Sequence, residues 1–97
     1  MARPEKVRLE VKSAVDVGKA ERVFRLRDKY VQVHGTFVAT LQVEATIDGE
    51  FFAVGPVMAA PGVVPVPETV ELVRVRTTAY TSGDPEAVLA GFDERAV

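Results

Sequence analysis

The chain has 97 residues, of which 47% are hydrophobic and 27% charged, and its formal net charge at pH 7 is −2. This length allows one domain with one core, and this composition is typical of a folded globular domain. The weakly acidic balance argues against a nucleic-acid partner, which normally requires a basic excess. Because the chain has no cysteine and one histidine, disulfide frameworks, iron–sulfur clusters and thiolate zinc sites are excluded, and we expect no cofactor and no metal.

No apolar run approaches the roughly 20 residues that span a bilayer, so we expect no membrane partner. The chain begins with a charged segment that lacks the apolar core of a signal peptide. We therefore expect a single domain over residues 1–97 that is made in the cytoplasm without a signal peptide.

Alternation of apolar and polar residues predicts a first strand over residues 7–12, with Val7, Leu9 and Val11 facing inward. Two alternatives remain open for residues 1–20: they pair within the sheet, or they form an extended arm that is exchanged with a neighbouring subunit. Two short strands are predicted next, over 23–26 and 30–33, with residues 27–29 as a polar turn between them.

The clearest strand covers residues 40–47. Its predicted core face consists of Leu41, Val43, Ala45 and Ile47. The dipeptide Asp48-Gly49 follows, and between two apolar runs it is a strong hairpin signal because both turn positions tolerate positive φ. The returning strand is predicted over 50–54. Residues 55–67 contain four prolines, so we expect a loop or an edge segment there.

Regular structure is predicted to resume over residues 70–77, followed by a turn cluster over 80–85 and a last strand over 86–92. A helix is the alternative for this last segment, but Gly91 disfavours it. About seven short strands separated by turn signals indicate an all-β domain, a single antiparallel β-sandwich or jelly roll.

The sequence shows no recognisable set of catalytic residues. His34 is the only conventional general base, and Ser13, Thr36 and Ser82 carry no local signature of a nucleophile. The acidic residues show no calcium-loop spacing, and the glycines form no phosphate-binding motif. We therefore expect a protein that is not an enzyme.

Two features indicate interaction surfaces. The segment 55–67 is rich in apolar residues, and it either forms an interface or folds over one end of the sandwich as a lid to the core. Its candidate interface residues are Val57, Met58, Val63, Val64 and Val66. Arg74 and Arg76 share one strand face, where they either meet an acidic partner surface or form cross-strand pairs with Glu44 or Glu71.

Part of the chain resembles a family of small β-sandwich virion proteins, head-decoration or tail-associated, of tailed bacteriophages. The resemblance begins with Tyr30-Val31-Gln32-Val33-His34-Gly35-Thr36-Phe37, the alternating strand that follows, and Asp48-Gly49 before Phe51 and Phe52. It continues with Val73-Arg74-Val75-Arg76, Ser82-Gly83 and Ala87-Val88-Leu89-Ala90-Gly91. It covers roughly the last two-thirds of the chain and implies a short β-sandwich without catalytic activity.

The same elements are more weakly similar to discoidin-like domains, in which an Asp-Gly turn precedes a tryptophan. Here Phe51 or Phe52 stands at that place, and Leu72 stands where those domains have a tyrosine. Both resemblances imply the same class of fold. The absence of cysteine and of a signal peptide favours the phage family.

The resemblance implies a structural virion protein that decorates a capsid or forms part of a connector or tail. Its copies would associate, with a trimer favoured, through exposed strand edges and apolar loop residues, and would dock on a major capsid or tail protein. The alternative is a small binding module that recognises a carbohydrate or another surface ligand through His34, Arg76 and Tyr80.

Overall fold

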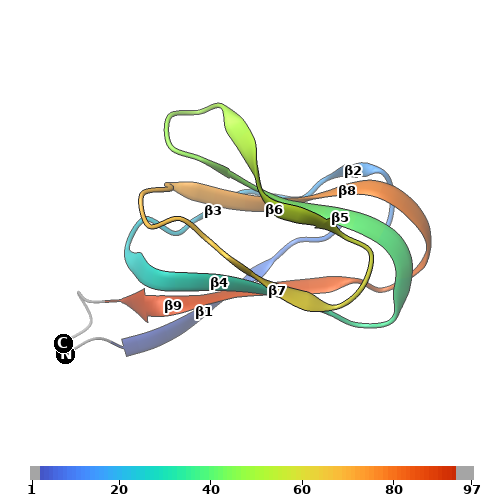
Figure 1. The fold of residues 1–97 in the computed structure, drawn as a ribbon, viewed down its shortest axis with the longest axis horizontal. Helices are drawn as coiled ribbons and strands as arrows, with labels where there is room; N and C mark the ends of the chain where they lie inside the picture. Colours follow the sequence, from blue (N-terminus) through green and yellow to red (C-terminus); the bar gives the residue numbers. More distant parts are fainter. Residues whose placement is uncertain (1–2, 94–97) are drawn as a thin grey trace.

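The structure is a computed structural model that describes residues 3–93. Within this range it contains nine strands and no helix, and every strand pair is antiparallel. The strands form two sheets that pack as the two layers of a sandwich (Figure 1). The predicted all-β antiparallel sandwich is thus confirmed, with nine strands in place of about seven.

The four-stranded sheet has the order β1-β9-β4-β7. Its strands are β1 (Arg3–Leu9), β9 (Glu86–Asp93), β4 (Leu26–His34) and β7 (Gly62–Pro65). Strand β1 pairs with β9 of the same chain along its whole length, from Arg3 opposite Asp93 to Leu9 opposite Ala87. The first strand therefore begins and ends earlier than the predicted range 7–12, and it lies within the sheet of its own chain.

The five-stranded sheet has the order β2-β8-β5-β6, and β3 also pairs with β8. Its strands are β2 (Asp16–Val17), β3 (Glu21–Arg22), β5 (Phe37–Thr46), β6 (Phe51–Met58) and β8 (Leu72–Gly83). Strand β8 continues through most of the predicted turn cluster over 80–85, so the turn is shorter than predicted. The last predicted strand, over 86–92, is confirmed as β9.

The core lies between the sheets and consists mainly of β-branched and leucine side chains that alternate along the strands. Its fully buried members include Val31, Val33, Leu41, Val43, Val73, Val75 and Leu89. The prediction that Ile47 joins this face was wrong, because β5 ends at Thr46 and Ile47 begins the following turn with 56% of its surface exposed.

The predicted turn at residues 27–29 is a bulge inside one continuous strand, β4. Asp28 adopts a φ of 51°, and the chain keeps its direction. The neighbouring Lys29 side chain is fully buried, with Nζ donating to the carbonyl oxygens of Leu26 at 2.7 Å and Glu68 at 3.3 Å. The side chain that the sequence pattern places in a polar turn therefore fills the end of the core.

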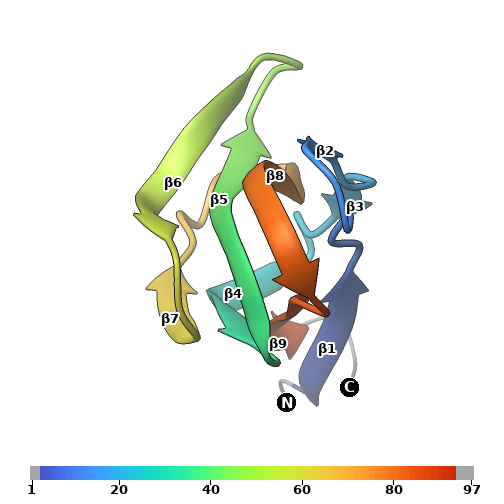
Figure 2. The same ribbon diagram turned by 90° about the vertical axis from the view of Figure 1, so that its right-hand side faces the viewer.

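The proline-rich segment 55–67 crosses from one sheet to the other. Strand β6 continues to Met58 and β7 follows at Gly62–Pro65, and each is an edge strand of its own sheet. Figure 2 shows the two strands at the same side of the sandwich. The prediction of an edge segment is confirmed, and Pro56 and Pro65 lie in these edge strands, where a missing backbone donor is tolerated.

Candidate interaction surfaces

The candidate interface residues of the segment 55–67 separate into two groups. Val57 and Val63 are 54% and 58% exposed, and Met58 is half-buried. Val64 and Val66 are 2% and 6% exposed and belong to the core. Side chains alternate along an edge strand, so the segment has an inward side that closes the core and an outward side that is free for contact.

Arg74 and Arg76 on β8 both pair with the carboxylate of Glu44 on the neighbouring strand β5. Arg74 Nε donates to Glu44 Oε1 at 2.8 Å, and Arg76 Nε donates to Glu44 Oε2 at 3.0 Å. Burial alone would raise the pKa of Glu44, but the hydrogen bonds and charges of Arg76 and Arg74 outweigh it and lower that pKa. The Arg74 guanidinium also lies 3.7 Å from the Phe51 ring centroid. The cross-strand pairing with Glu44 is thus the observed arrangement.

The three residues of the ligand-binding alternative come from both sheets. His34 lies on β4 of the four-stranded sheet, with Nδ1 3.9 Å from Glu86 Oε2. Arg76 and Tyr80 lie on β8 of the five-stranded sheet, and the Tyr80 hydroxyl donates to the carbonyl oxygen of Gly83 at 2.7 Å. The structure therefore places His34 in the other layer of the sandwich from Arg76 and Tyr80.

The outer surface of the four-stranded sheet carries exposed apolar side chains beside basic ones. Register puts Lys6, Ala90, Tyr30 and Pro65 in one row across the sheet, and Arg8, Val88, Gln32 and Val63 in the next. Phe92 and Arg27 lie opposite each other in a third row. We call this surface the basic–apolar face. Tyr30, Val63 and Phe92 are 52%, 58% and 43% exposed.

Sequence analysis missed this face, although β9 carries a signal of it. Ala87 and Leu89 are buried, while Val88 and Ala90, which alternate with them, point to the opposite side of the strand. A strand that is apolar on both sides is either covered on both or leaves one apolar face in solvent. Here no described segment covers the outer side, as the two-layer arrangement in Figure 1 shows.

A second exposed feature is the hairpin tip, residues 47–52, which consists of the turn between β5 and β6 and the first two residues of β6. Ile47, Asp48, Gly49 and Glu50 are all exposed, and Phe52 is 39% exposed. Gly49 has a φ of 94°, which agrees with the predicted Asp-Gly turn. Figure 1 shows this loop projecting from the five-stranded layer on the side away from the four-stranded layer. The tip therefore presents apolar and acidic side chains together.

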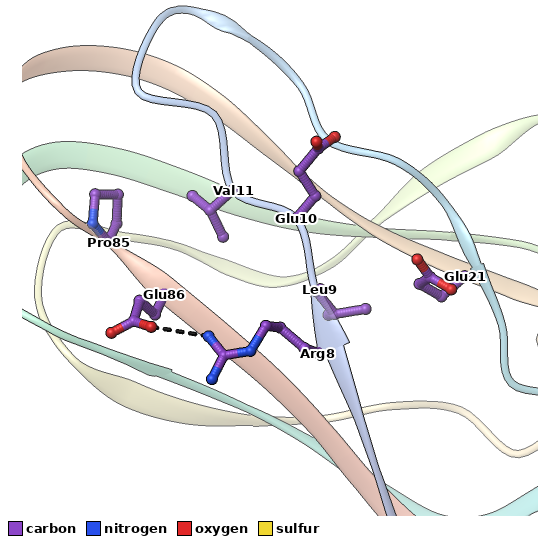
Figure 3. Close-up of a pocket in the computed structure, with 7 residues that line it drawn as sticks. All are labelled: Arg8, Leu9, Glu10, Val11, Glu21, Pro85 and Glu86. Atoms are coloured by element: carbon purple, nitrogen blue, oxygen red, sulfur yellow. Dashed lines mark hydrogen bonds and ion pairs between the residues drawn. The ribbon is translucent and has the colours of Figure 1, made fainter.

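A recess lies where β1 leaves the four-stranded sheet, and Figure 3 shows its lining. Two of its lining residues are joined where Arg8 donates to Glu86 Oε1 at 2.8 Å, and a third, Glu10, accepts a hydrogen bond from the backbone of Lys19 at 2.9 Å. Glu21 lies on the far side of the recess from Glu86. In the range 3–93 no three acidic or histidine side chains come together as a metal site, and no helix is long and apolar enough to cross a membrane.

Comparison with known proteins gives a likeness of fold. The chain is similar to the SPBc2 prophage-derived protein YomS, whose crystal structure matches with a TM-score of 0.73 and 13% sequence identity over 95% of each chain. No model of a protein family matches the chain. No curated protein matches it by sequence. The two-sheet fold of this chain is therefore also the fold of a prophage-derived protein, over nearly the whole of both chains.

Proposed function

We propose that this protein is a non-enzymatic structural component of a tailed phage or prophage-like particle. Its roles would be capsid decoration or a place in the connector or tail. The observation that carries the proposal is the shared fold with a prophage-derived protein over 95% of both chains. The protein would act by associating with itself, with a trimer favoured, and by docking on a major capsid or tail protein.

The exposed surfaces support contact through faces and loops more than through strand edges. The edge strands β1, β6 and β7 contain Pro4, Pro56 and Pro65, and proline at an edge discourages pairing with a further strand. The basic–apolar face and the hairpin tip, in contrast, expose large apolar side chains. Such patches tend to mark sites of protein–protein contact.

The carbohydrate-binding alternative receives no support from the strand positions, because His34 lies on a different sheet from Arg76 and Tyr80. A pocket that recognises a small ligand needs polar groups that converge on one point. We therefore advance the structural role alone.

Mass spectrometry of purified particles tests the proposal. Particles released by the source strain after prophage induction are banded on a density gradient, and the chain is quantified against the major capsid protein. We expect a fixed stoichiometric ratio across the particle band. Absence of the chain from banded particles, with the chain present in the same cell extract, would refute a structural role.

A further inference from the structure

The hairpin tip and the basic–apolar face carry opposite charge and similar exposed apolar character. The tip has two exposed carboxylates, Asp48 and Glu50, between the exposed apolar side chains of Ile47 and Phe52. No lysine or arginine lies within residues 47–52. The tip is therefore a small acidic and apolar projection.

On the face, the outward strand positions carry Lys6, Arg8 and Arg27. Two carboxylates accompany these three basic residues on β9 and β4: Glu86, which pairs with Arg8, and Asp28, which is exposed in the bulge of β4. The face is therefore net positive, although the whole chain has a net charge of −2. Its apolar part lies beside these charges, on Tyr30 and Phe92 and at the β7 edge on Val63.

We propose that the hairpin tip of one copy docks on the basic–apolar face of a second copy. This inference rests on the self-association in the proposed function and names the two surfaces that make the contact. Asp48 and Glu50 would lie against Lys6 and its basic neighbours, while the apolar side chains of tip and face cover one another. Complementary charges also favour this orientation over others, since like charges placed together disfavour a complex.

The same charges disfavour the two symmetric alternatives. A face-to-face dimer would bring two net positive faces together, and a tip-to-tip dimer would bring four carboxylates together. The tip projects from one layer, away from the other layer that carries the face (Figure 1), so one chain cannot make the contact with itself. A contact between two different surfaces closes into a ring or continues as a filament. Closure after three copies would give the trimer that the proposed function favours.

Two double variants test the inference. The tip variant is Asp48→Lys with Glu50→Lys, and the face variant is Lys6→Glu with Val63→Asp, two exposed positions on the opposite edge strands of the face. A matched control is Asp84→Lys, an exposed acidic residue between β8 and β9. Circular dichroism and thermal unfolding confirm that each variant is folded.

Light scattering after size-exclusion chromatography gives the mass over a concentration series. We expect wild type and the control to form the same oligomer, and each double variant alone to be monomeric. An equal mixture of the two variants should give a species of twice the monomer mass, because it combines one intact tip with one intact face. Added salt should weaken the wild-type oligomer.

Three results would overturn the inference. Wild-type mass in either folded variant would show that copies associate through other surfaces, which leaves the proposed function in place. A mixture that stays monomeric would exclude the tip-on-face contact. A wild type that is monomeric at every concentration would exclude it as well, and the particle composition would then decide the proposed function separately.

Discussion

Replacing Lys29 by alanine should destabilise the fold strongly, although the sequence pattern places this residue in a polar turn. The side chain is fully buried, and Nζ donates to the carbonyl oxygens of Leu26 and Glu68. The three methylenes beyond Cβ, at about 0.8 kcal/mol each, contribute about 2.4 kcal/mol. Loss of the hydrogen bonds from a charged donor adds roughly 1.5 kcal/mol, the low end of the range, because the desolvation cost of the ammonium is lost too.

We therefore expect the free energy of unfolding to fall by about 4 kcal/mol in Lys29→Ala, from a total of roughly 5–15 kcal/mol for a domain. Urea titration followed by far-ultraviolet circular dichroism measures this change. Lys29→Met is the matched control: it keeps the buried stem and should recover about 2 kcal/mol relative to Lys29→Ala.

Glu68→Gln separates the carbonyl contacts from the ion pair. The Glu68 carboxylate lies 3.6 Å from Nζ but is 54% exposed, so its substitution should cost less than about 1 kcal/mol. A Lys29→Ala variant within about 1 kcal/mol of wild type would refute the reasoning, because neither the buried stem nor the carbonyl contacts would then support the fold.

Three further predictions concern other parts of the sandwich. A Cβ at Gly91 would lie 2.9 Å from a carbonyl oxygen of β4 and 3.1 Å from Lys29 Cγ. Gly91→Ala should therefore lower the free energy of unfolding by about 1–3 kcal/mol. An unchanged melting temperature would show that the bulge in β4 can move to make room for the methyl group. Glu44 has a pKa lowered from its ordinary 4.5, so its stabilisation is present above that pH and is lost as the pH falls through the lowered value. Glu44→Gln should therefore be less stable at neutral pH, and its unfolding free energy should converge with that of wild type in acid; curves that stay parallel would contradict the shift. Val63→Asp should change stability by less than about 0.5 kcal/mol, whereas Val64→Asp buries a charge in the core and should prevent folding; equal stability of these neighbours would refute the assigned strand orientation.

The class of fold could be predicted because alternation of apolar and polar residues follows directly from the geometry of a half-buried strand. Leu41, Val43 and Ala45 are buried as that pattern requires. The bulge at Asp28 and Lys29 could not be predicted, because the buried ammonium depends on a carbonyl oxygen of Glu68, far away in the sequence. The burial of Lys29 is a tertiary effect that no local pattern contains.

The candidate surfaces were harder to predict than the fold. Residues 55–67 were recognised as apolar, but the side of the strand on which each valine lies depends on register, and only the structure shows that Val63 points outward and Val64 inward. In the sequence, Val88 and Ala90 of β9 cannot be told apart from core residues, because they are apolar like their buried neighbours. Which of its two apolar sides is covered depends on the second sheet, whose strands come from other parts of the chain.

The position of β9 has a consequence for biosynthesis. This strand is synthesised after the other eight described strands, yet it lies between β1 and β4 and is the neighbour with which β1 pairs. Until β9 has been synthesised, β1 and β4 lack the strand with which they both pair, and their edges stay exposed. The pairing of β1 with β9 joins residues that are far apart in the sequence, so it forms late. Chains that stop before β9 would therefore be open to proteolysis and aggregation. The four-stranded sheet can be completed only after β9 has been translated.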